Sequence, residues 1–480
     1  MRTVLVAILG TVVAACSASE DSGTVHPAIA HVALIPAPVE FEALAGSCVL
    51  GDSTQIELVQ AQPYDSQLGA EGYRLDVTEQ GIRIRANSAA GLLYGRMTLR
   101  QLLPAQYPGF DRAAGRWQLP CVRVVDHPRF AWRGYMLDVA RHFFPVADLK
   151  RWIEILASYK INTLHLHLTD DQGWRLAIAD RPRLTDIGAA GAVGDAPGGY
   201  YTAQDFADLV QYAQQHAMQI VPEIDMPGHT HAALASYAEL NCSRQAPAPY
   251  RGTQVGISSL CLSADVTATT YRFVDEVLAS VAAMSPSPYL HVGADEAHQT
   301  EASDYRAFVQ HVQHRVAGLG RVMVAWEEAA HADVSAATVL QVWINSLDLE
   351  QLDPGLRLIA SPATRAYLDM RYDADTTWGT MWAGYVSLER AYDWDPVTEI
   401  AGVSESRVVG VEGALWTENV PDAEAVEFMS FPRVLGYAEI GWSPIAARSW
   451  SGYRERLAMH GPRLRAAGVH YYADPSLDWY

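Results

Sequence analysis

The pattern of apolar and polar positions divides the chain into two regions. Between residues 31 and 125, short strand-like runs alternate with turns, and one helical stretch covers Ala89 to Leu103. From residue 126 onward, strand-like runs alternate with helical segments instead. This change predicts an α/β protein in which a small α+β domain at 31–125 precedes a (β/α)8 TIM barrel at 126–480.

The runs that carry these predictions can be given by residue. In the small domain, strands are predicted at Ile56 to Val59, Gly72 to Val77, Gly81 to Arg85 and Cys121 to Val125. The eight barrel strands are predicted at Gly134 to Val139, Asn162 to Leu168, Gln219 to Ile224, Tyr289 to Val292, Arg321 to Ala325, Val339 to Ile344, Leu356 to Ala360 and Val408 to Leu415. Helices are predicted at Ala147 to Tyr159, Ala203 to His216, Thr270 to Met284 and Glu301 to Ala317, and long loops at 189–200 and 237–261.

Polar and aromatic side chains follow the predicted barrel strands. In chain order they are Arg133, Asp138, Arg141 and His142, then Asp170, Asp171 and Trp174, Glu223, Asp225 and His229, Asp295 and Glu296, Trp326 and Glu327, Trp343, Tyr367 and Asp369, and Trp416 and Glu418. The carboxyl ends of barrel strands are where such folds carry their active sites. Carboxylates accept hydroxyl protons and indole rings cover apolar sugar faces, so we predict a pocket for a neutral polyhydroxylated ligand.

Composition and charge exclude some classes of protein. Apolar residues make up 49% of the chain and charged residues 19%, which is typical of a globular protein with a full core. The formal net charge of -20 argues against nucleic-acid binding. The 13 tryptophans and 23 tyrosines suit a sugar pocket as well as a core.

The first 16 residues resemble a bacterial lipoprotein signal peptide. An apolar run from Val4 to Ala15 is too short to cross a bilayer, and it ends in the lipobox-like Val13-Ala14-Ala15-Cys16. We predict lipidation at Cys16, a polar linker at 17–30, and export to the cell envelope or periplasm, with the lipid as the only membrane attachment. An ordinary signal peptide, cleaved after Ala15 or Ala18, is the alternative.

Four further cysteines remain, an even number in an exported protein. We predict that Cys242 and Cys261 pair and staple one long loop. Cys48 and Cys121 either pair or remain free buried thiols. A zinc site is disfavoured because no close Cys-x-x-Cys spacing occurs.

Six motifs stand out along the chain: Trp132-Arg133-Gly134, His-Leu-Thr-Asp170-Asp171-Gln-Gly-Trp174, Glu223-Ile-Asp225-Met-Pro-Gly-His229, His-Val-Gly-Ala-Asp295-Glu296, Tyr367-Leu-Asp369 and Leu-Trp416-Thr-Glu418. Together they resemble the motifs of glycoside hydrolase family 20, the β-N-acetylhexosaminidases. The resemblance extends over essentially the whole chain after the signal segment. One departure is Ala294, at a position where the family commonly has glycine.

The resemblance implies a role for each matching residue. Glu296 would be the general acid and base, Asp295 would hold the substrate's acetamido N–H, and Tyr367 would hold its carbonyl oxygen. The remaining implied site residues are Arg133, Asp170, Asp369 and Glu418 for ring hydroxyls, Trp326, Trp343 and Trp416 as pocket walls, and His229 as a supporting partner. No cofactor or metal is implied, and the expected substrates are N-acetylhexosamine-terminated oligosaccharides.

The implied mechanism is substrate-assisted retention, in which the acetamido oxygen is the nucleophile. It requires a raised pKa at Glu296, caused by burial and by the charge of Asp295, while Asp295 stays ionised. Tryptophans at several strand ends suggest a closed pocket for one terminal sugar, and therefore exo action.

Two other functions fit parts of the sequence. His165 and His167 lie on one face of a predicted strand and could bind zinc in a metal-dependent hydrolase, with His229 and His231 as further ligands. Packing inside the barrel is the simpler explanation of this pair. A surface lipoprotein that only captures oligosaccharides would use the same acids and aromatics, but it would need no proton donor such as Glu296.

Overall fold

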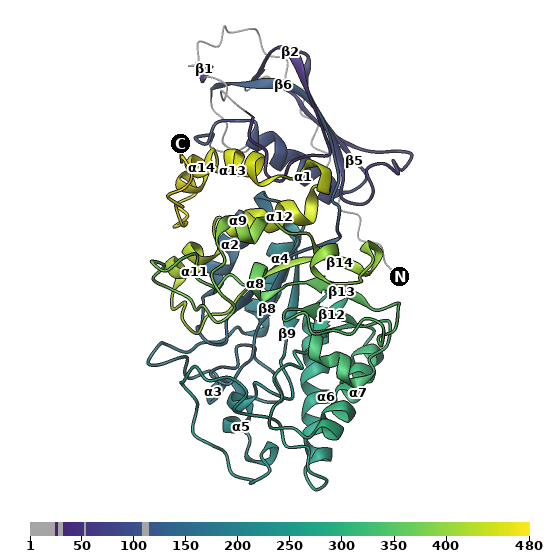
Figure 1. Cartoon of the computed structure of the whole chain (residues 1–480), viewed down its shortest axis with the longest axis vertical. Coiled ribbons are helices and arrows are strands. Elements are labelled where there is room, and N and C mark those ends of the chain that lie inside the picture. The colour runs from purple at the N-terminus through teal and green to yellow at the C-terminus, as the bar shows by residue number, and fades with distance from the viewer. Residues whose placement is uncertain (1–24, 27–31, 52–53, 108–114) are drawn as a thin grey trace.

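The computed structural model describes residues 25–26, 32–51, 54–107 and 115–480. The predicted signal segment and Cys16 lie outside the described residues. Figure 1 shows a small domain at the top, a barrel below it, and the C-terminal helices α13 (Trp450–Ala458) and α14 (Gly461–Ala466) next to the small domain. Among the helices of the described residues, none combines the length and apolar character needed to span a bilayer.

The small domain is a sheet with one helix, α1 (Ala89–Gln101), packed against it. Its strands follow the order β1-β6-β4-β5-β3, and β2 also pairs with β6. Their bounds are β1 Val25–His26, β2 Glu40–Leu50, β3 Ile56–Gln60, β4 Tyr73–Thr78, β5 Gly81–Ala86 and β6 Arg116–Asp126. Strand β1 lies inside the segment expected to be a linker, and the sequence pattern missed β2. A disulfide joins Cys48 of β2 to Cys121 of β6, which settles the pairing that the sequence left open.

The second region is a closed barrel of eight parallel strands, as predicted. Its strands are β7 Trp132–Asp138, β8 Thr163–His167, β9 Gln219–Glu223, β10 Tyr289–His291, β11 Val322–Trp326, β12 Val339–Val342, β13 Arg357–Ala360 and β14 Val408–Leu415. Strand β14 pairs with β7 and closes the ring. Every predicted barrel strand overlaps an observed one, because each run is apolar enough to be buried on both faces.

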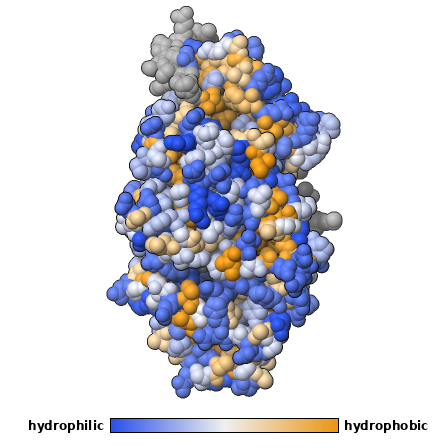
Figure 2. Space-filling model, viewed as in Figure 1, coloured by the Kyte–Doolittle hydropathy of each residue, from blue (hydrophilic) through white to orange (hydrophobic). Residues whose placement is uncertain are grey.

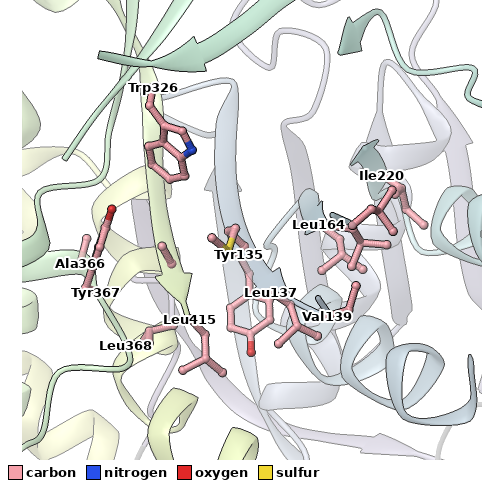
Figure 3. Packing of buried hydrophobic residues seen from close by; sticks show 14 of the residues in the cluster. Tyr135, Leu137, Val139, Leu164, Ile220, Trp326, Ala366, Tyr367, Leu368 and Leu415 are labelled. Atoms are coloured by element: carbon pink, nitrogen blue, oxygen red, sulfur yellow. The ribbon is translucent and has the colours of Figure 1, made fainter. Parts of the chain in front are cut away.

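Helices surround the barrel. The four that the sequence predicts are α2 Val146–Ser158, α4 Ala203–Gln215, α6 Thr267–Met284 and α7 Ala302–Gly318. Shorter helices are α3 Arg183–Asp186, α5 His231–Ser236, α8 Ala363–Ala366, α9 Leu388–Tyr392, α10 Pro396–Glu399, α11 Ala423–Ser430 and α12 Arg433–Trp442, with 3-10 turns η1 Ala238–Leu240, η2 Glu327–Ala332, η3 Glu405–Arg407 and η4 Ile445–Ala447. Figure 3 shows part of the core between strands and helices, including Leu137, Leu164 and Leu415. The face in Figure 2 is mostly hydrophilic, with apolar residues in several patches.

The barrel interior changes from apolar to polar along its axis. One layer is an apolar cluster of Trp132, Val221, Val324, Val339 and Ile359. Because side chains alternate along a strand, the next inward positions of the same strands lie closer to the carboxyl ends. Those positions include Glu223, Trp326 and Gln341, so the layer nearer the strand ends is polar.

The small domain is attached at the amino ends of the barrel strands. Arg133, near the start of β7, donates from Nη2 to Glu71 of the small domain at 2.6 Å. Lys160, just before β8, donates from Nζ to Asp126 at the end of β6 at 2.8 Å. Arg133, Lys160 and Asp126 are fully or almost fully buried. This junction therefore lies at the end of the barrel opposite to the carboxyl ends.

Candidate active site

A pocket of about 320 Å³ lies at the carboxyl ends of the barrel strands. Its lining residues are Arg141, His229, Thr253, Val255, Asp295, Glu296, Trp343, Tyr367, Asp369, Thr380, Trp382, Trp416, Glu418 and Asn419. Eight of these were candidate site residues in the sequence: His229, Asp295, Glu296, Trp343, Tyr367, Asp369, Trp416 and Glu418. The three other candidates, Arg133, Asp170 and Trp326, do not line it.

Asp295 and Glu296 follow β10 on a tight backbone turn. Gly293 has a φ of +66°, and a Cβ there would lie 1.7 Å from Asp225 Oδ1, so the position requires glycine. Ala294 and Glu296 also have positive φ, at 73° and 41°. Ala294 N donates to Asp225 Oδ1 at 3.1 Å, which holds the turn in this left-handed geometry.

Glu296 is paired with a histidine. His229 Nε2 lies 3.4 Å from Glu296 Oε2, and His229 Nδ1 lies 3.2 Å from Asp170. Burial disfavours the charged imidazole, but the carboxylates of Asp170, Asp225 and Asp295 outweigh burial and raise the pKa of His229 well above its ordinary value. His229 is therefore a cation beside the carboxylate of Glu296.

The expected pKa pattern of the acid pair is wrong for the free protein. Burial acts to raise the pKa of Glu296, but the charge of His229, whose Nε2 lies 3.4 Å from Glu296 Oε2, outweighs it and lowers the pKa. The pKa of Asp295 is raised, chiefly by burial. The motif could not reveal this reversal, because His229 lies far from Glu296 in sequence and meets it only in the fold.

The arginine in the pocket is Arg141, not Arg133. Arg133 and Tyr135 point outward from β7 while Trp132 and Asp138 point inward, as alternation along a strand requires. Arg133 is consequently held by the backbone oxygens of Lys160 and Phe130 and by Glu71, so the expectation that it binds a ring hydroxyl is wrong. Arg141 was among the strand-end residues in the sequence, but the resemblance assigned the role to Arg133.

Arg141 holds a cluster of acids in place. Its Nη2 lies 2.8 Å from Asp170 and 3.5 Å from Glu418, and its Nη1 lies 3.2 Å from Asp138. Asp170 is 1% exposed, and the charges of Arg141 and His229 lower its pKa against the effect of burial. Asp170 is thus engaged behind the pocket, and its predicted contact with ring hydroxyls is wrong.

Aromatic rings form much of the pocket wall. The rings of Trp343 and Tyr367 lie within 7° of parallel with 6.1 Å between centroids, and Trp382 meets both edge-on. Trp326 is fully buried behind Trp416, with 5.7 Å between centroids, so it supports the pocket from behind rather than lining it. Trp382 is 58% exposed and follows no strand, so the strand-end pattern had no signal for it.

Two further acids line the pocket near Arg141. Burial and the charge of Glu418 raise the pKa of Asp369 well above its usual range. Burial also raises the pKa of Glu418, although Arg141 opposes this shift. Asp369 Oδ1 is buried and makes no hydrogen bond within the described residues. These acids can therefore exchange hydrogen bonds with ligand hydroxyls.

The long loop predicted at 237–261 contributes to the pocket wall. The predicted disulfide Cys242–Cys261 is present and closes a loop that brings Thr253 and Val255 to the pocket. The loop rests on the barrel through Gln172, whose side chain donates to Gly252 O at 2.8 Å.

The histidines of the metal-hydrolase alternative form ion pairs. His165 Nδ1 lies 2.8 Å from Glu412, and His165 Nε2 lies 3.1 Å from Glu223. Burial opposes protonation of His165, yet the two glutamates raise its pKa to about 9. His167 lies between Glu223 and Asp170 in the same way, and its pKa is raised well above the ordinary value. Both ring nitrogens of each histidine face a carboxylate, so the geometry favours buried ion pairs.

Comparisons with known proteins identify the family of the chain. The model of glycosyl hydrolase family 20, catalytic domain, matches residues 130–445, and that of the family's domain 2 matches residues 58–127. A beta-N-acetylhexosaminidase of Cellulomonas fimi is 40% identical over 419 residues, covering 86% of this chain and 83% of the relative.

Solved structures are similar over almost the whole chain. The family 20 beta-N-acetylhexosaminidase of Streptomyces coelicolor A3(2) superposes with a TM-score of 0.88 and is 42% identical, covering 94% of this chain and all of that one. A mutant Streptomyces plicatus beta-hexosaminidase in complex with the product GlcNAc has a TM-score of 0.87 and 41% identity, covering 94% and 99% of the two chains. The chain therefore belongs to glycosyl hydrolase family 20 and is a glycoside hydrolase.

Proposed function

We propose that the protein is an exo-acting, retaining β-N-acetylhexosaminidase that uses the substrate's own acetamido group as nucleophile. The observation that carries this proposal is the adjacency of Asp295 and Glu296 in one pocket with Tyr367. Adjacent carboxylates seldom flank a glycosidic bond from both sides, which ordinary retaining glycosidases require. Substrate-assisted catalysis needs only one acid and base beside a group that holds the acetamide.

In the first step, the acetamido oxygen attacks the anomeric carbon and the glycosidic bond breaks. Glu296 gives its proton to the leaving oxygen, so the products are an alcohol and a bicyclic oxazolinium. Asp295 accepts the acetamido N–H and offsets the positive charge that grows there, while Tyr367 donates to the acetamido oxygen.

In the second step, Glu296 removes a proton from water as the water attacks the anomeric carbon. The oxazolinium opens and the sugar leaves with its original configuration. His229 favours the ionised form of Glu296 that this step needs. A sugar ring over Glu296 would strengthen the effect of burial and favour the protonated form that the first step needs.

The remaining pocket residues suit one terminal N-acetylhexosamine. Arg141, Asp369 and Glu418 can bind ring hydroxyls, and Trp343 and Trp416 can cover the ring's apolar faces. A pocket of about 320 Å³ fits one sugar better than a chain running through it. We expect chitin-type oligosaccharides to be among the substrates.

The proposal is tested with two aryl glycosides that differ only at the second carbon. The purified protein should hydrolyse the aryl N-acetylglucosaminide and should barely turn over the matching glucoside, which lacks the acetamido nucleophile. Similar rates on both would rule out substrate assistance. Binding without turnover of either would instead favour the lipoprotein that only captures oligosaccharides.

Exo action is tested separately with chitooligosaccharides. A time course should release monosaccharide from the first minutes, because the pocket accepts only a terminal sugar. Internal fragments that appear before monosaccharide would contradict the assignment.

We further propose that the protein is exported and held at the cell envelope by a lipid on Cys16. The support is the lipobox-like sequence ending at Cys16.

A further inference from the structure

Two consecutive acids follow β11, and both hold the residues after β12. Glu327 is 1% exposed, and its carboxylate accepts from the backbone amides of Trp343, Asn345 and Ser346 at 2.9, 3.2 and 2.7 Å. It also accepts from the Ser346 hydroxyl at 2.6 Å. Glu327 thus fixes the backbone of this loop, and its oxygens are engaged away from catalysis.

Glu328 holds the side chain that the same loop carries. Its Oε2 accepts a hydrogen bond from Trp343 Nε1 at 3.0 Å. Trp343 lines the pocket and lies nearly parallel to Tyr367, as described above. Trp343 is therefore held at two points: Glu327 fixes its backbone and Glu328 fixes its ring.

The surroundings of Glu328 favour its protonated form. Burial, followed by the charge of Asp295, raises the pKa of Glu328 to about 8. An uncharged acid accepts from the indole through its carbonyl oxygen, and a glutamine side chain can do the same.

We propose that Glu328 is a positioning residue that sets the specificity of the enzyme for the size of the N-acyl group. This inference rests on the proposed function, in which Asp295 and Tyr367 hold the acetamide. Trp343 is then the neighbouring wall on the side of Tyr367. A ring fixed by a hydrogen bond admits an acetyl group in one geometry and resists a longer acyl chain.

Removal of this hydrogen bond should therefore lower kcat/KM by different factors for substrates with different acyl groups. Without the bond to Glu328, the indole of Trp343 can rotate. The acetamide then loses part of its orientation, which lowers kcat, while a larger acyl group meets less resistance. One hydrogen bond of this kind corresponds to about 10-fold in kcat/KM.

The test uses Glu328→Gln, Glu328→Leu and aryl glycosides that carry N-acetyl or N-propionyl groups. Glu328→Gln should retain the wild-type rate and selectivity near pH 6. Glu328→Leu should lose about 10-fold in kcat/KM on the N-acetyl substrate, mainly in kcat, and clearly less on the N-propionyl one. Glu350→Leu, the same change at an exposed site in the following loop, is the control and should change neither value.

A double-mutant cycle shows whether Glu328 acts through the indole. In a Trp343→Phe background there is no Nε1–H to hold, so Glu328→Leu should cause little further change. Additive losses, or an equal loss on both acyl substrates, would overturn the proposal. Thermal unfolding of each variant separates loss of fold from loss of position.

The outcomes also separate this inference from the proposed function. If the wild-type protein does not hydrolyse the N-acetyl substrate, the proposed function fails. If it does and Glu328→Leu keeps the wild-type acyl selectivity, only the inference about Glu328 fails.

Discussion

His229 Nε2 lies 3.4 Å from Glu296 Oε2, and the other nitrogen of the same ring faces the buried carboxylate of Asp170. The proposed acid is therefore in contact with a cation whose charge is fixed from behind. This contact explains why the pKa of Glu296 is lowered in the free protein although burial acts to raise it.

Glu296→Gln should slow substrates with poor leaving groups most. The amide cannot give up a proton, whereas activated aryl groups leave with little protonation. General acid catalysis is worth about 10²- to 10⁴-fold, so the loss on alkyl glycosides should fall in or above this range. The measurement is kcat/KM for a series of glycosides whose leaving groups differ in pKa. Equal losses across the series would remove Glu296 from the acid role.

Asp295→Ala should be harmful because the acetamide loses its orientation and its charge stabilisation. On the aryl glucoside, which has no acetamide, Asp295→Ala should lower the already slow wild-type rate only slightly. The two changes damage one step and should not be additive. Steady-state kinetics of both proteins on both substrates provide the comparison. Equal fold losses on the two substrates would contradict a role for Asp295 at the acetamide.

The two arginines around β7 should behave differently. Arg141→Met removes a charged hydrogen-bond donor from the pocket, so kcat/KM should fall about 10- to 100-fold. Arg133→Met breaks a buried ion pair at the domain junction and should cost about 3 kcal/mol of unfolding free energy.

Kinetics and urea unfolding of both variants test this contrast. The folded Arg133→Met protein should keep near wild-type kcat. A large loss of kcat in that variant would show that Arg133 does act in the active site.

Stability should depend on pH through His165. The folded-state pKa of about 9 is above the unfolded value of 6.5, so the stabilisation is fully present below about pH 6.5 and is lost as pH rises through 9. The shift corresponds to about 3 kcal/mol. Urea unfolding at pH 6.5 and pH 9.5 should show a larger fall for the wild type than for His165→Gln. Parallel falls would mean that His165 is not protonated in the folded state.

The mature N-terminus should be a lipidated Cys16. Mass spectrometry of the protein from a bacterial host with lipoprotein processing should show a diacylated or triacylated cysteine. Cys16→Ser should release the protein from membranes. An unmodified N-terminus at Ser17 or later in the wild type would contradict lipid anchoring.

Several features were predictable because they depend on local sequence. The eight barrel strands are short runs of apolar residues between turns, and burial on both faces requires such runs. The turn at Gly293 and the two acids after it are contiguous in the chain, so their place at a strand end followed from the pattern. Cys242 and Cys261 lie within one loop that their bond closes.

Other features could not be predicted because they depend on direction and on distant partners. Whether Arg133 or Arg141 reaches the pocket depends on which face of β7 each side chain takes. The exposed Trp382 follows no strand, and only the folding of its loop brings it to Tyr367. The pairing of Glu328 with Trp343 joins two loops through tertiary contact.

The sequence by itself determined the class of fold, the end of the barrel that carries the site, and the acid pair at its centre. These follow from periodicity and from residues adjacent in the chain. Only the tertiary structure decided the charge of each acid, because pKa values depend on burial and on groups from other strands. It also decided which residues touch the pocket, since a side chain near a strand end can point inward, outward or behind its neighbours.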